Sequence, residues 1–254
     1  MKDKKNGSGH HYDTDDNKIV HLPTLAERDR MRKEKQQKEK AAGKPAKVPF
    51  FNISKIPLFT RILVIAFLLV HIPVFVFFNS GQKLEAFYTM GFVPGYFTGA
   101  AGGMPWFAPL SILTHMFIHG SWMHLLFNVT MTLAMGMFFE ANFGTRTTIK
   151  FFFICGMAGA LIYFILNPFS TVPVIGASGG ISGLFGAVLV ELYQRGQIGG
   201  IGKRGPWPII IFWLVFMVIT GMFSGENMAW QAHVGGFLAG IGLLHLMKKG
   251  RIRL

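Results

Sequence analysis

Two short stretches of the sequence carry the side chains needed for nucleophilic catalysis. Ser178 lies in PVIGASGGISGLFGA, residues 173–187, and His233 lies in AWQAHVGGFLAG, residues 229–240. A serine hydroxyl becomes an effective nucleophile when a neighbouring imidazole takes its proton near neutral pH. Both residues open apolar segments, where polar side chains are costly and are therefore candidates for function. The sequence predicts a Ser178–His233 dyad, because no Asp or Glu is placed to orient the histidine.

A third stretch, THMFIHGSWMHLLFN over residues 114–128, supplies candidate hydrogen-bond donors. His124 and Asn128 are four residues apart and share one helix face, whereas His119 precedes the predicted N-cap and does not share it. Attack on a carbonyl creates an oxyanion that needs preplaced donors. The Asn128 amide, an imidazole N–H of His124 and the backbone N–H of Ser178 could provide them.

The same stretch permits a metal-binding alternative, in which His115, His119 and His124 belong to a zinc transporter or metalloenzyme. Apart from Glu191 at the inner end of one of them, the segments predicted to cross the membrane lack the acidic residues that usually complete such a path, and the HExxH pattern is missing. A zinc site would also leave Ser178 and His233 unexplained. We expect neither a metal nor a cofactor.

The elements that position these groups are predicted to be membrane-spanning helices. Hydrophobic residues make up 51% of the 254, and the mean hydropathy is +0.40. A span needs about 20 mostly apolar residues. Segments of that kind occur at 58–78, 122–139, 147–166, 178–194, 208–223 and 230–247. The expected fold class is an all-α integral membrane protein, a six-transmembrane-helix bundle with a long apolar first outer loop.

The positive charge follows a membrane topology and not a nucleic-acid-binding surface. Of the 25 Lys and Arg residues, 15 fall within residues 1–61, and the predicted outer connections 79–121, 167–177 and 224–229 contain only Lys83. Basic residues concentrate in cytoplasmic segments. We therefore expect both termini in the cytoplasm and no nucleic-acid partner. The basic tail favours a bacterial inner (plasma) membrane.

Two domains are expected. Residues 1–54 are predicted to form a polar, basic and largely disordered cytosolic tail that could touch anionic lipid. Residues 55–254 form the membrane domain. Its outer loop 79–121 is too apolar for an ordinary connection and is expected to lie partly in the membrane interface, ending in a turn at Gly120 with Ser121 as N-cap.

Small residues indicate which helices touch. In the last span His233, Gly236 and Gly240 follow at i, i+3 and i+7, and such a stripe lets another helix approach closely. A matching stripe occurs in the fourth span: Ser178, Ser182 and Gly186. Both spans are predicted to run inward from the outer side, so the serine and the histidine would meet there. The glycines alone would serve helix packing equally well.

The sequence resembles the rhomboid family of intramembrane serine proteases across about residues 55–247. The family pattern H-x-x-x-x-H-x-x-x-N matches His119, His124 and Asn128. The G-x-S-G pattern matches residues 176–179, and A-H-x-x-G-x-x-x-G begins at Ala232. Members often carry Tyr or Phe four residues after the serine, stacked on the catalytic histidine, where this chain has Ser182.

The resemblance implies a role for each matched side chain: Ser178 as nucleophile, His233 as general base, and His124 with Asn128 in the oxyanion hole. It also implies hydrolysis of transmembrane protein substrates near their outer end, within the lipid bilayer. A catalytically inactive relative that binds transmembrane helices is the alternative, and such a protein would be expected to have lost Ser178 or His233.

Overall fold

A computed structural model describes residues 56–198, 205–223 and 229–254, together with residues 12–13, 20–21, 24–27, 29–30 and 33–34. The chain divides into two compact units, Met1–Asn52 and Ile53–Leu254. The first unit contains the antiparallel strands β1 (Tyr12–Asp13) and β2 (Val20–His21). The predicted disorder of the tail falls mainly on residues outside those described.

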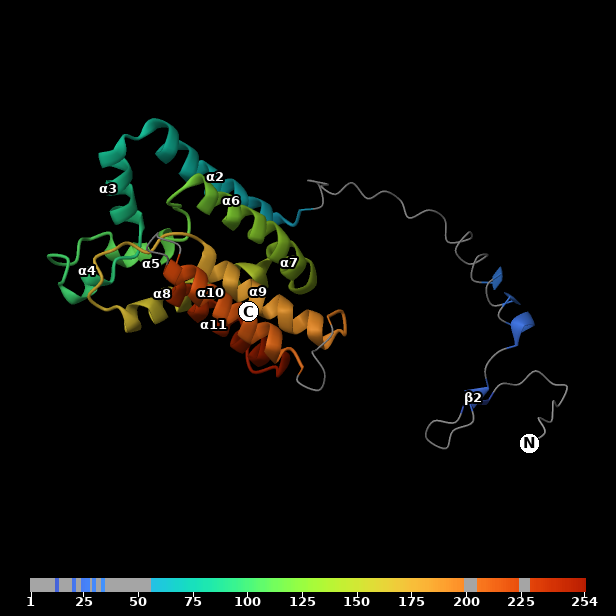
Figure 1. Ribbon diagram of the computed structural model, residues 1–254. Coiled ribbons are helices and arrows are strands. Elements are labelled where there is room, and N and C mark those ends of the chain that lie inside the picture. The colour runs from blue at the N-terminus through green and yellow to red at the C-terminus, as the bar shows by residue number, and fades with distance from the viewer. Residues whose placement is uncertain are drawn as a thin grey trace, which may run out of the picture. The chain divides into compact units, whose positions relative to one another are not determined.

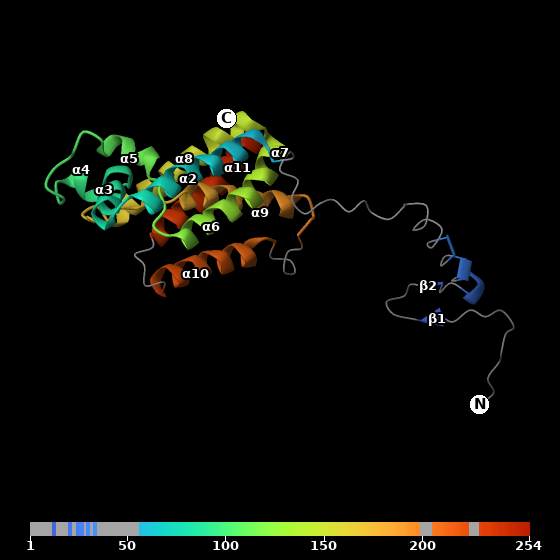
Figure 2. The same cartoon turned by 90° about the horizontal axis from the view of Figure 1, so that it is seen from above.

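The second unit is helical at each of the six segments predicted to span the membrane. Its elements are α2 (Leu58–Phe77), α3 (Ser80–Met90), α4 (Pro94–Thr98), α5 (Ala108–Thr114), α6 (Trp122–Met131), the π-helix η2 (Thr132–Gly136), α7 (Met137–Phe143), α8 (Thr145–Leu166), α9 (Ser178–Gln194), α10 (Trp207–Phe223) and α11 (Trp230–Lys248). The predicted bounds differ from these by at most a few residues, chiefly because α6, η2 and α7 continue to Phe143. In Figure 2, α10 lies at the periphery of the bundle.

Three of these helical segments, Leu58–Phe77, Trp122–Phe143 and Thr145–Leu166, are long and apolar enough to cross a membrane. Helix α2 also presents an exposed apolar stripe at helical spacing: Ile62, Ile65, Leu69, Ile72 and Val76. A continuous apolar face of this kind is unfavourable in water and favourable against lipid chains. The second unit is therefore all-α and the protein is an integral membrane protein, and the six-crossing count stays a prediction.

The loop predicted to lie at the interface contains the short helices α3, α4 and α5, which gather at one end of the bundle (Figure 1). Asn79 begins α3 with a capping box to Gln82. The loop is tied to the segment before α9 by a two-way backbone pair between Phe92 and Val174, with N–O distances of 2.9 and 2.8 Å. This pair links the apolar loop directly to the chain that leads into Ser178.

Helices α9 and α11 meet along a glycine seam formed by Gly179, Gly183, Gly236 and Gly240. A Cβ atom on Gly236 would overlap the carbonyl oxygen of Gly179, and one on Gly240 would overlap that of Gly183. Two members of the predicted stripe on α9 face α11, since Ser178 contacts His233 and a Cβ atom on Gly186 would lie 2.8 Å from the Phe237 carbonyl oxygen. Between them the closest backbone approach is at Gly183 and not at the predicted Ser182. Backbone contact still occurs, as the small residues indicated.

Glu140 of α7 caps the N-terminus of the first predicted span, α2, from a different helix. Its carboxylate accepts hydrogen bonds from the backbone N–H groups of Phe59 and Thr60 and from the hydroxyls of Thr60 and Thr145, all at 2.8 Å. The N-cap position of α2 is Pro57, which offers no side-chain acceptor. A buried anion at a helix N-terminus satisfies the orphaned N–H groups and interacts favourably with the helix dipole.

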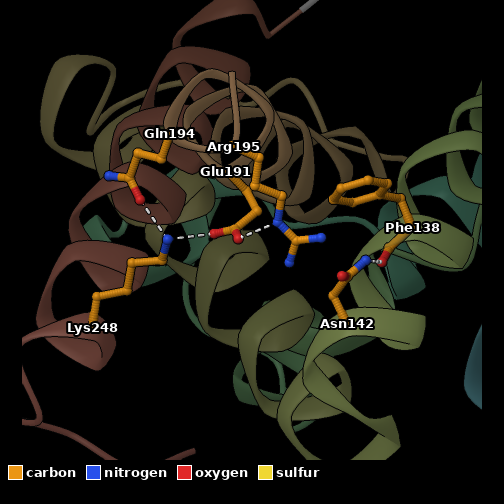
Figure 3. Close-up of polar contacts among 6 residues, drawn as sticks. All are labelled: Phe138, Asn142, Glu191, Gln194, Arg195 and Lys248. Atoms are coloured by element: carbon orange, nitrogen blue, oxygen red, sulfur yellow. Dashed lines mark hydrogen bonds and ion pairs between the residues drawn. The ribbon is translucent and has the colours of Figure 1, made fainter. Parts of the chain in front are cut away.

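A second buried carboxylate fastens α9 to α11 at the end of α9 remote from Ser178. Glu191 contacts Arg195 at 2.7 Å and Lys248 at 2.6 Å, and Lys248 also bonds the Gln194 side chain (Figure 3). The Arg195 guanidinium lies over the Phe138 ring at 5.8 Å. These residues, the Glu191 cluster, connect three helices around one desolvated charge.

Candidate active site

Ser178 is the first residue of α9, and His233 lies in the first turn of α11. The Nε2 atom of His233 is 2.7 Å from the Ser178 Oγ atom, a hydrogen-bond distance. The glycine seam allows this contact, since it lets the first turn of α11 lie against the backbone of α9. The serine and histidine that the sequence paired are therefore adjacent.

A cavity of about 530 Å³ opens beside this pair. Ser178 and His233 line it together with His124 and Asn128 from α6. Residues 172–176, which precede α9, form another part of the wall. All four predicted site residues thus border one space large enough for a peptide segment and water.

Gly176 leaves room for the His124 ring beside the start of α9. Its φ angle is +106°, in the region that favours glycine, and a Cβ atom there would lie 2.6 Å from the His124 Nε2 atom. The Gly120 N–H donates to His124 Nδ1 at 3.4 Å. A neutral ring whose Nδ1 accepts carries its proton on Nε2, the atom that lies beside Gly176 at the cavity wall.

Asn128 lies one turn below His124 on the same face, and its Nδ2 atom donates to the His124 carbonyl at 2.8 Å. A primary amide carries two N–H bonds, so this contact leaves one for another acceptor. The first N–H groups of α9 lack intrahelical acceptors because they begin the helix. Residues of two helices that carry hydrogen-bond donors therefore line the cavity that contains Ser178.

His115 and His119 support Gly176 and His124, two residues of the site. The His115 carbonyl accepts the Gly176 N–H at 2.7 Å, and its ring Nδ1 pairs with the Ser111 carbonyl at 2.9 Å. The ring of His119 is fully buried and lies edge-on to the His124 ring, with centroids 5.3 Å apart. Burial lowers the pKa of His115 to about 4 and that of His119 to about 3, so both rings are neutral at pH 7.

The histidines give no support to the metal alternative. Among the residues that the structure describes, no group of three or more His, Cys, Asp and Glu side chains is arranged to hold a metal ion. Ser182 is buried, and no hydrogen bond between described residues joins it to His233. In the same part of the chain, no carboxylate is hydrogen-bonded to His233.

Sequence reasoning missed two groups that hold the site. One is the His115 backbone carbonyl that anchors Gly176, and backbone roles of this kind leave no side-chain signal. The other is the pair Gly156 and Gly159 on α8, which lie against Met116 and the Ala232 carbonyl. Their spacing, GMAG within an apolar helix, was the available indication of close packing.

Comparison with known proteins gives concordant matches. The family model described as the Rhomboid domain matches residues 106–249. The chain is similar to a putative rhomboid protease, YdcA, from Bacillus subtilis, at 31% identity over 163 residues, covering 63% of this chain and 76% of that protein. It is 30% identical over 132 residues to RHOMBOID-like protein 5 of Arabidopsis thaliana and 31% identical over 132 residues to the rhomboid protease GlpG of Salmonella newport. These two matches cover 52% and 51% of this chain, but only 42% and 45% of the relatives' own lengths.

Proposed function

This chain belongs to the rhomboid family, and on that premise we propose that it is an intramembrane serine endopeptidase acting through a Ser178–His233 dyad. The observation that carries the proposal is the 2.7 Å contact between the hydroxyl and the imidazole at the edge of a cavity. An inactive helix-binding relative would have no use for this alignment. The substrates of the proposed protease are membrane proteins, which it cuts near the outer end of a transmembrane helix.

The proposed reaction has two halves. In the first, Ser178 Oγ attacks the scissile carbonyl carbon while His233 Nε2 takes the hydroxyl proton. The tetrahedral intermediate then loses its amine, which receives that proton from His233, and an ester remains on the serine. In the second, His233 deprotonates a water molecule that attacks the ester, releasing the carboxylic acid and restoring the hydroxyl.

The charge that develops on the carbonyl oxygen is assigned to three donors: the Nε2–H of His124, the free amide N–H of Asn128 and the backbone N–H of Ser178. The helix N-terminus adds a favourable partial charge. Loss of one such donor costs a factor of about 100 or more in turnover in comparable sites. Asn128→Ala should therefore lower kcat strongly and change KM little.

The placement of the protein follows the charge distribution. We assign both termini to the cytoplasm, which puts Ser178 toward the outer side, and we assign the protein to a bacterial inner membrane. Residues 1–54 remain a proposed cytosolic tail.

The test uses the purified full chain and a model transmembrane substrate in proteoliposomes, with a serine-reactive fluorophosphonate as a second readout. Ser178→Ala should abolish both cleavage and labelling, and His233→Ala should abolish cleavage. Matched controls exist on the same helices, since Ser182→Ala and the exposed His245→Ala make the same changes outside the cavity. Normal cleavage by Ser178→Ala or His233→Ala would refute the dyad.

A further inference from the structure

Two buried oxygen atoms of the second span have no hydrogen-bond partner among the residues that the structure describes. They are the Oδ1 atom of Asn128 and the hydroxyl oxygen of Thr132, on residues that are 4% and 0% exposed. Leaving such atoms unpaired in a protein interior is costly. The two are complementary, because an amide oxygen can only accept and a hydroxyl can donate.

Their positions make them neighbours. The Thr132 backbone N–H donates to the Asn128 carbonyl, so one helical turn separates the residues and both side chains lie on one face. The orientation of the Asn128 amide is also determined. Its Nδ2 atom lies 2.8 Å from the His124 carbonyl, and a reversed amide would bring two oxygens together there.

We propose that Thr132 is a positioning residue for the oxyanion site. Its hydroxyl donates to Asn128 Oδ1, either directly once the hydroxyl has turned or through one buried water. With the His124 carbonyl holding one edge of the amide and Thr132 the other, the amide plane is fixed. The remaining Asn128 N–H then points toward the substrate oxygen without reorganisation when charge develops.

This inference rests on the proposed function, since it assigns a support to the Asn128 donor. It also separates two roles that Thr132 could have. A hydroxyl that only contributed to stability would change folding and leave turnover intact. A hydroxyl that fixes the amide should affect turnover, and only while Asn128 is present.

The experiment compares Thr132→Val, which is nearly isosteric but lacks the hydroxyl, with Thr132→Ser, which keeps it. In the full chain with the model transmembrane substrate, Thr132→Val should lower kcat about fivefold, the size expected for one neutral hydrogen bond, with KM unchanged. Thr132→Ser should stay near wild type. Thr130→Val is the matched control, because Thr130 is exposed on the same helix.

A double-mutant cycle decides the mechanism. In an Asn128→Ala background, Thr132→Val should cause no further loss, and its melting temperature should not fall below that of the single Asn128→Ala variant. The inference is overturned if Thr132→Val turns over like wild type, if Thr132→Ser is as slow as Thr132→Val, or if the two losses multiply. If Asn128→Ala itself has wild-type turnover, the oxyanion assignment falls first and the Thr132 role falls with it.

Discussion

The carboxylate of Glu140 offers a test of how the first span is held, independent of any catalytic role. Each of its oxygens accepts two hydrogen bonds, one from a backbone N–H and one from a hydroxyl. Oε1 accepts from the Phe59 N–H and the Thr145 hydroxyl, and Oε2 accepts from the N–H and the hydroxyl of Thr60. In Glu140→Gln, the amide oxygen can still accept hydrogen bonds from two of the four donors. The amide NH₂ faces the other two donors and cannot accept from them. Bonds to a charged acceptor contribute about 1.5 kcal/mol or more each, so the loss of two amounts to ~3 kcal/mol.

A loss of that size should lower the melting temperature by ~6–12 °C, given ~2–4 °C per kcal/mol for a protein of this size. The chain supplies its own reporter, because its single cysteine, Cys155, is fully buried and becomes reactive when the helices separate. Thermal unfolding in detergent can be followed with a maleimide dye that fluoresces on reaction with thiols. Glu85→Gln, at an exposed position of α3, makes the same change without the four donors. If Glu140→Gln melts within about 2 °C of wild type, the carboxylate does not organise α2.

Three further predictions follow from single positions. Gly236→Ala should lower both melting temperature and fluorophosphonate labelling, because its methyl group meets the α9 backbone, whereas Gly242→Ala, with open space at the same helix, should do neither. Gly176→Ala should abolish cleavage with less effect on melting, since the Cβ both strains a +106° φ angle and displaces the adjoining imidazole; normal cleavage would remove this glycine from the site. His115 and His119 should make stability fall as pH drops below about 6.5 toward 4, because their folded pKa values lie below the unfolded value and the unfolded chain binds the extra protons. Melting curves at pH 7.5 and 5.5 check this, and His119→Phe should weaken the pH dependence; a melting temperature that rises toward pH 5.5 would contradict it.

The sequence predicted the structure best where a reactive or capping side chain lies at the start of a helix. Apolar length located the helical segments, and the serine and histidine could be paired because both begin helices rich in small residues. The Ser121 N-cap was predicted from type and position, and it accepts the His124 N–H at 3.1 Å. These features depend on local sequence, which is why they could be read without a structure.

Other features depend on contacts between distant segments. The stripe on α9 was placed through Ser182 because spacings of three and four residues both keep small residues on one face, and only the partner helix selects Gly183. The π-helix at Thr132–Gly136 has no distinctive composition. Glu140 looked like a residue at a helix end, and its role became visible only when the first turn of α2 was found around it.

The Glu191 cluster has a consequence for the catalytic pair that its position does not suggest. Glu191 lies thirteen positions after Ser178 on α9, or ~20 Å along the axis. Sliding α11 past α9 by a single residue, ~1.5 Å, would pull Lys248 from a desolvated carboxylate and His233 from the serine in the same movement. The Glu191–Lys248 ion pair therefore fixes the alignment of α9 and α11 that the Ser178–His233 contact requires. Loss of either charge should displace His233 from the Ser178 hydroxyl.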